Sequence, residues 1–228
     1  MDDSRASPSQ YERLGVFPTA DDGIRLSATK LWDETTRPTR PESPADVTYS
    51  AVGRRVGSHL IAVHDHLRGE LEKIRRLIDS VELGDVSPRH AIDSLDQFTI
   101  RQNRWTVGAY CAAYCRMIAL HHGLEDADVF PHLVTCEEQL APVIDRLSEE
   151  HTVIHDVLEG LNRALVELVA HPGDFTELRR ATDILTDTLL SHLAYEEHEL
   201  VEPLARCGFY VGQVPTATGD AFDVVSRD

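Results

Sequence analysis

Three pairs of side chains that can bind metal are spaced four residues apart in this chain of 228 residues. The pairs are His121 with Glu125, His151 with His155, and His192 with Glu196. Residues four apart lie about 6 Å from each other on one side of an α-helix, so each pair can present two ligands to one point. Each pair, and a seventh candidate, His64, falls in a stripe of Leu, Ile and Val with helical spacing. Because polar groups in a core are costly unless they are paired or bound to metal, the pattern predicts helices packed around a metal site.

Apolar periodicity predicts four long helices. The first starts near residue 47 and ends at Gly84, and its inner face steps by four and three residues through Leu60, His64, Leu67, Leu71, Ile74 and Ile78. We expect Ser87 to cap the second helix, with Pro88 at its first position, a bend near 97–99 and an end or kink at Pro131.

The third helix is expected from about residue 141, with an inner face that includes Ser148, His151 and His155, to the stop at 172–173. The fourth is expected from about 175 to Glu202, where Pro203 ends it. Helices of this length joined by short loops predict an all-α fold, an up-down-up-down four-helix bundle over residues 47–204.

The two flanking segments are irregular in pattern. Residues 1–46 are rich in proline, and we expect this arm to dock on the bundle by burying Phe17, Leu26, Leu31 and Trp32. Residues 205–228 contain several glycines and are expected to form an irregular tail.

Composition narrows the class of protein. The net charge of −17 and the absence of a basic cluster argue against nucleic acid as a partner. No run of 18 apolar residues exists, which argues against a membrane span, and the first residues do not read as a signal peptide, so a cytoplasmic location is expected. The four cysteines form no CxxC pair, and we predict no disulfide framework from them.

Four stretches of the sequence resemble the hemerythrin-like, or HHE cation-binding, family. They are residues 64–71, 121–131, 149–155 and 192–203. The resemblance implies a diiron centre, two Fe ions with a bridging oxo or hydroxo group. It implies one ion on His151, His155 and His192, the other on His64 and His121, and bridges from Glu125 and Glu196.

Some neighbouring side chains leave alternatives open. Oxygen-carrying hemerythrins have an Asp five residues after the last His, where this chain has Glu197. Glu196 shares the stripe of His192, whereas Glu197 is rotated by about 100°, so Glu196 is the predicted ligand. His122 and Asp126 lie one step off the ligand face, where they either orient ligands or take a place at the surface or at a helix interface. Glu199 and Glu202 are expected on a solvated face.

The ligand set bears on function. Diiron bundles that activate oxygen usually carry more carboxylates than the two expected here, so we expect a non-heme diiron protein that binds or senses O2, or a related molecule such as NO or peroxide. The alternative is an enzyme on the same site, either a diiron oxidase or oxygenase or one that removes NO or peroxide. A carrier needs a narrow apolar pocket over the metal, and an oxidase needs a channel with polar contacts. Iron storage is a third possibility.

Overall fold

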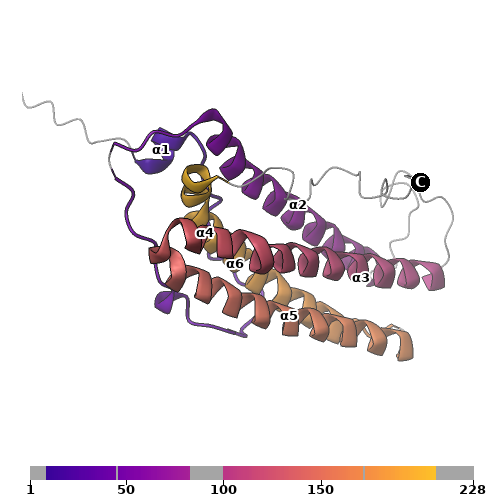
Figure 1. The fold of residues 1–228 in the computed structure, drawn as a ribbon. Coiled ribbons are helices and arrows are strands. Elements are labelled where there is room, and N and C mark those ends of the chain that lie inside the picture. Colours follow the sequence, from indigo (N-terminus) through magenta and orange to yellow (C-terminus); the bar gives the residue numbers. More distant parts are fainter. Residues whose placement is uncertain (1–8, 45, 83–99, 172, 209–228) are drawn as a thin grey trace, which may run out of the picture.

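The computed structural model describes residues 9–44, 46–82, 100–171 and 173–208, and all regular structure in these ranges is helical. Four long helices dominate (Figure 1): α2 (Ala51–Glu82), α3 (Ile100–Leu124), α5 (Ala141–Ala170) and α6 (Thr176–Cys207). The short elements are α1 (Gln10–Leu14), α4 (Phe130–Cys136), the 3-10 helices η1 (Glu34–Thr36) and η3 (Glu138–Leu140), and the π-helix η2 (Glu125–Val129). The predicted cap at Ser87, the start at Pro88 and the bend near 97–99 lie outside the described residues. No described helix is both long enough and apolar enough to cross a membrane.

The long helices pack in a ring, in which α2 and α5 each contact both α3 and α6. Their buried apolar side chains form two clusters, one at each end of the bundle. On α2, Leu60 belongs to one cluster and Leu67 to the other, and His64 lies between them. On α5, His151 lies in the same way between Leu147 and Ile154. The ligand-type residues therefore occupy a polar layer between two apolar clusters.

Close packing of α2 against α6 depends on two glycines. A Cβ atom at Gly53 would lie 2.0 Å from the Ala205 carbonyl oxygen, and one at Gly57 would lie 2.9 Å from that of Val201. Because only glycine permits this approach, the two helices come together at the end of the bundle nearest His64 and Glu196.

Prolines interrupt the helices less than the sequence predicts. The second helix passes through the π-helical turn Glu125–Val129 and continues as α4, with Pro131 in the first turn of α4. The prediction that Pro203 ends the last helix is wrong, because α6 runs to Cys207. Pro203 removes one backbone donor, but the helix is buried on both sides of it, at Val201 and Leu204, and this packing holds the last turn.

A disulfide links Cys136 at the end of α4 to Cys207 at the end of α6. The prediction of no disulfide framework did not anticipate this single cross-link. The two residues are 71 positions apart, so no spacing motif marks them. Cys111 and Cys115 are free and buried in the core.

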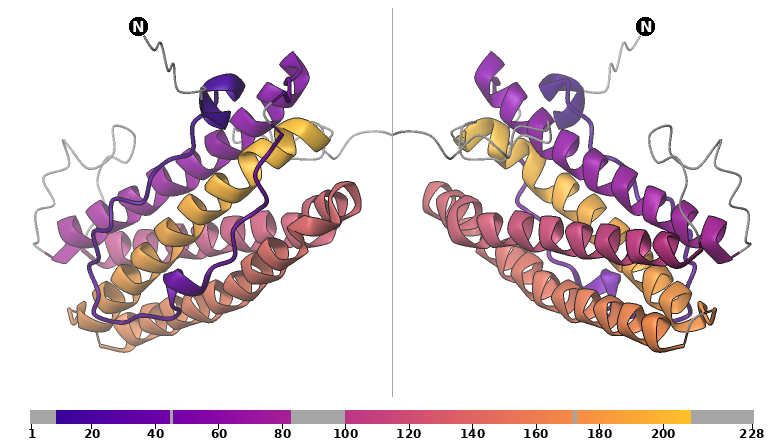
Figure 2. Two further views of the ribbon diagram at one scale, coloured as in Figure 1. Left: turned by 90° about the vertical axis from the view of Figure 1, so that its left-hand side faces the viewer. Right: turned by 90° about the vertical axis from the view of Figure 1, so that its right-hand side faces the viewer.

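The N-terminal arm (residues 9–44) lies along the outside of the bundle beside α6 (Figure 2). Of the four side chains expected to dock it, Phe17, Leu26 and Leu31 are 61%, 42% and 40% exposed, and Trp32 is half-buried. The arm buries Leu14 and Val16 instead.

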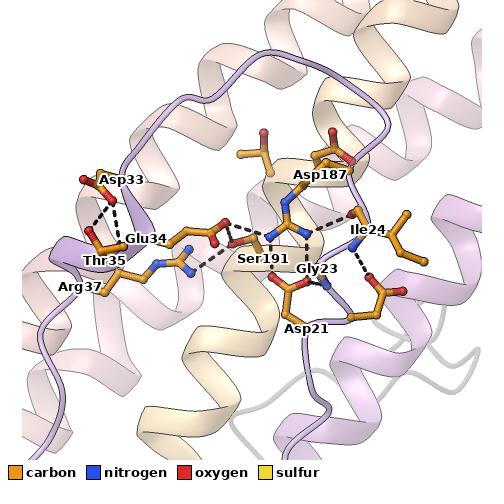
Figure 3. A network of polar contacts seen from close by, with 12 residues as sticks. Asp21, Gly23, Ile24, Asp33, Glu34, Thr35, Arg37, Asp187 and Ser191 are labelled. Carbon is orange, nitrogen blue, oxygen red and sulfur yellow. Dashed lines mark hydrogen bonds and ion pairs between the residues drawn. The ribbon is translucent and has the colours of Figure 1, made fainter.

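Most other contacts of the arm are polar. Backbone amides of the arm donate to buried carboxylates of α6, among them Leu26 and Ser27 to Asp187 and Arg40 to Glu199. Figure 3 shows Glu34 and Arg37 reaching Ser191 of α6. Glu199 and Glu202 are thus buried under the arm, contrary to the solvated face expected for them.

Candidate metal centre

Seven buried side chains form two adjacent groups in the polar layer. One group is His122, His151 and His192, and the other is His64, His121, Glu125 and Glu196. Within each group the potential ligand atoms all lie within 4.8 Å of one another. The residues come from all four long helices and from the π-helical turn that follows α3, so the centre requires the assembled bundle.

Both glutamates reach across from one group to the other. Glu125 places Oε1 3.2 Å from Nε2 of His121 and Oε2 3.7 Å from Nε2 of His151. Oε2 of Glu196 lies 3.6 Å from Nε2 of His64 and 3.5 Å from Nε2 of His192. Each carboxylate is therefore placed where it could bridge two cations, one in each group.

Five buried atoms of the two groups have no hydrogen-bond partner within the described part of the chain. They are Nε2 of His122, His151 and His192, and Oε2 of Glu125 and Glu196. Within the group that contains Glu125 and Glu196, Nε2 of His64 and Nε2 of His121 face each other at 3.1 Å. Each unpaired buried polar atom costs about 1–3 kcal/mol. A pair of cations would satisfy all of these atoms, so the residues present fit a two-metal centre.

Carboxylates hold the outer nitrogens of three of the histidines. Nδ1 of His64 lies 3.0 Å from Glu197, Nδ1 of His151 lies 3.0 Å from Asp126, and Nδ1 of His192 lies 3.1 Å from Glu150. Such contacts fix the ring orientation and leave Nε2 directed toward the space where a metal could bind. The sequence left the role of Asp126 open and did not single out Glu150, although Glu150 directly precedes His151.

The structure does not place His155 in the centre. It is exposed on α5, and neither group of the described residues includes it. The buried stripe of α5 passes through Leu147, His151 and Ile154, so the stripe drawn from the sequence through Ser148 and His155 is displaced by one residue. His155 lies one position beyond the stripe and turns toward solvent.

His122 stands in the centre instead. Its ring stacks on that of His151, with centroids 3.9 Å apart and an angle of 7° between the planes. Neighbouring residues on a helix point about 100° apart, so His121 can face His64 on α2 while His122 faces His151 on α5. From the sequence, the role of His122 is open between orienting a ligand and lying at the surface or at a helix interface.

The neighbouring carboxylates Glu196 and Glu197 lie in different places. Glu196 belongs to the second group. Glu197 lies on the outer side of His64, where it also accepts from Arg68 at 2.7 Å and from the backbone amide of Thr19 at 2.7 Å. These contacts lower the pKa of Glu197 against the opposing effect of burial.

Burial also sets the protonation of the site. Desolvation and the nearby His64 lower the pKa of His121 to about 3, and desolvation keeps the pKa of His122 well below its usual value. Both imidazoles are therefore neutral at pH 7, as metal ligands must be. Burial and the neighbouring Glu196 raise the pKa of Glu125, whereas the surrounding histidines lower that of Glu196 despite its burial.

A cavity of about 30 Å³ adjoins the second group. Its apolar walls are Val56, Leu60, Val63, Leu124, Val129 and Leu204. His121 and Glu125 close one side, and His59 also lines it. A space of this size holds about one water-sized molecule.

Comparison with known proteins places the chain in a family. The model of the hemerythrin HHE cation-binding domain matches residues 55–204, which include all seven residues of the two groups. No curated protein and no solved structure gives a significant match. The match covers most of the chain, so the chain belongs to the hemerythrin HHE cation-binding family.

Proposed function

We propose that the chain is a non-heme diiron protein that binds or senses O2 or a related small molecule such as NO or peroxide. The observation that carries the proposal is the set of five unpaired nitrogen and oxygen atoms that converge on one buried layer. Three of them belong to neutral or hydrogen-bonded imidazoles and two to carboxylates that span the groups, a donor set suited to iron.

The two groups divide the ligands between two ions. His122, His151 and His192 would hold one ion, and His64 and His121 the other, with Glu125 and Glu196 between them. His155, which the family resemblance suggested as a ligand, has no part in this assignment. When bound, the iron pair would supply electrons for reversible reduction of a small oxidant. The protein's part is to keep His121 and His122 neutral, hold the histidine rings in place and exclude bulk water.

The size of the cavity favours a small ligand. At about 30 Å³ with apolar walls, it accommodates a diatomic molecule or peroxide beside His121 and Glu125. A cavity of this volume is too small for an organic substrate. A larger groove of about 420 Å³ lies between the arm, α5 and α6, and none of the seven residues lines it. Removal of NO or peroxide remains compatible with the same cavity, whereas an oxidase acting on a larger substrate is not supported.

We also infer the up-down-up-down order for the four long helices. Each long helix contacts the long helix that follows it in the chain, and α2 contacts α6 to close the ring. Consecutive contacts of this kind favour antiparallel neighbours.

The test is an optical experiment on protein loaded with iron under anaerobic conditions. Admitting air should produce a new charge-transfer band that disappears on degassing, over repeated cycles. Val63 lies in the cavity wall, and a Val63→Phe variant that still holds two irons provides the control, because it should lose the band. An irreversible change after one exposure would speak for turnover or autoxidation and against reversible binding.

A further inference from the structure

Two hydrogen-bond paths lead from the N-terminal arm to histidines of the metal centre. In the first, Arg37 donates to both oxygens of Glu150, at 2.8 and 2.9 Å, and Glu150 contacts Nδ1 of His192 at 3.1 Å. In the second, the backbone amide of Thr19 donates to Glu197, which contacts Nδ1 of His64. The arm precedes residues 55–204, which the family model covers. Both paths therefore begin outside the matched domain.

Arg37 is held firmly in its place. Its side chain is 10% exposed, and the guanidinium lies 5.4 Å from the centroid of the Trp32 ring and 4.6 Å from that of Tyr195. It also donates to Ser191 of α6 at 3.1 Å (Figure 3). The fork of the guanidinium matches both oxygens of a carboxylate, which fixes Glu150 more narrowly than a single hydrogen bond would.

The position of Arg37 has an electrostatic consequence. A carboxylate that accepts from Nδ1–H of an imidazole orients the ring and makes Nε2 a stronger donor to metal. A guanidinium that pairs with the same carboxylate withdraws part of the negative charge of the carboxylate. It also places a positive charge two hydrogen bonds away from the histidine that binds the metal. Both effects disfavour the more highly charged, oxidised state of a metal ion on His192.

We propose that Arg37 is a positioning residue of the metal centre, which holds His192 through Glu150 and raises the reduction potential of the ion that His192 binds. The docked arm thereby sets how readily the centre is oxidised. This inference rests on the proposed function, since it requires that the centre hold a redox-active metal.

The chain supplies a matched control in Arg40. Arg40 belongs to the same arm, and its side chain is 5% exposed and pairs with buried Glu202 at 3.4 Å. Glu202 in turn contacts Tyr49 and Arg206, and no contact joins it to the seven centre residues in the described ranges. Removing either arginine costs the arm one buried ion pair, but only Arg37 touches a carboxylate that holds a ligand.

The experiment measures the midpoint potential of the full-length protein loaded with iron, for the wild type, Arg37→Met, Arg37→Lys and Arg40→Met. Arg146 also donates to Glu150 at 2.9 Å, so Arg37→Met leaves that carboxylate paired. We expect Arg37→Met to shift the ratio of oxidised to reduced iron on the order of tenfold at fixed potential, which is a midpoint about 59 mV lower for one electron. Arg37→Lys should recover part of the shift, because it keeps the charge and loses the fork.

The outcomes separate this inference from the proposed function. A wild-type protein that takes up no iron would overturn both. If the wild type holds two irons and all four proteins share one midpoint, only the inference about Arg37 fails. An equal shift in Arg40→Met would also overturn it, since the effect would then belong to arm docking in general. Equal melting temperatures for Arg37→Met and Arg40→Met would show that a difference in midpoint does not arise from partial unfolding.

Discussion

The rings of His122 and His151 lie parallel, with centroids 3.9 Å apart, although the residues belong to α3 and α5. Nε2 of each ring is buried and unpaired within the described residues. The pairing of these two histidines, in place of His151 with His155 on one helix, defines one half of the proposed diiron centre.

The first prediction compares two histidines. His122→Ala should reduce the iron content of a fully loaded sample by about one ion per chain, because it removes one of three nitrogens in its group. His155→Ala should leave the content unchanged, because this residue is exposed. Metal analysis of both variants beside the wild type decides the matter. The reverse result, with iron lost only in His155→Ala, would restore the ligand set suggested by the family resemblance.

The sequence predicted the helical class and most of the polar layer because both follow from periodicity. Ligand-type residues in apolar stripes must point inward, and six of the seven predicted residues lie in the two groups. The exception is His155, which lies outside both groups. Along α5 the steps of three and four residues allow two neighbouring stripes, and only the packing of Ile154 against the other helices selects between them.

Features that depend on contacts between distant segments were beyond the sequence. Glu199 and Glu202 look solvated on a helix in isolation, and they are buried because the arm covers them. Nothing in the local pattern of Arg37 shows that it meets Glu150, 113 residues away. The pairing of Cys136 with Cys207 was missed for the same reason.

A second prediction concerns the stability of the metal-free protein in acid. The pKa of His121 is lowered to about 3, so below its unfolded value of 6.5 the unfolded chain binds a proton that the folded chain does not. The contribution of His121 to the free energy of unfolding is present above pH 6.5 and is lost as the pH falls toward 3. For one proton, the free energy of unfolding then falls by about 1.4 kcal/mol per pH unit. His122 and His151 act in the same direction, and the raised pKa of His192 opposes them.

Urea denaturation at pH 7 and pH 5 measures this effect. The free energy of unfolding should be lower at pH 5, and His121→Gln should show a smaller drop than the wild type. A free energy that stays constant between the two values would mean that these imidazoles are not buried in neutral form.

The third prediction concerns the cysteines. Cys136 is exposed, so a mild reductant should open the disulfide and release two reactive thiols. Burial raises the pKa of Cys111 to about 12 and that of Cys115 to about 11, so these two should react only after unfolding. Thiol titration before reduction, after reduction and in denaturant should therefore give zero, two and four groups. Two fast thiols before reduction would contradict the cross-link.

Loss of this cross-link should also lower stability. A disulfide that closes a loop of 71 residues lowers the conformational entropy of the unfolded chain, which stabilises the folded state by up to about 4 kcal/mol. Cys136→Ser should lower the free energy of unfolding by roughly 2–4 kcal/mol, and added reductant should then have no further effect on it.

A fourth prediction concerns the cavity beside His121 and Glu125. Val63→Phe places a larger side chain in a space of about 30 Å³ and should weaken binding of NO to the reduced, iron-loaded protein at least tenfold. Val63→Ala enlarges the same space and should leave NO binding intact or faster. Stopped-flow measurement gives the rate of NO binding to both variants and to the wild type. Equal rates for Val63→Phe and the wild type would indicate that NO reaches the centre by another route than this cavity.

The most direct test is an anaerobic titration of metal-free protein with Fe(II), followed by calorimetry and by metal analysis after desalting. The two groups of ligands predict an endpoint of two irons per chain, reached in the full-length wild type without added cofactor. An endpoint of one iron, or none retained after desalting, would contradict the diiron centre and with it the proposed function.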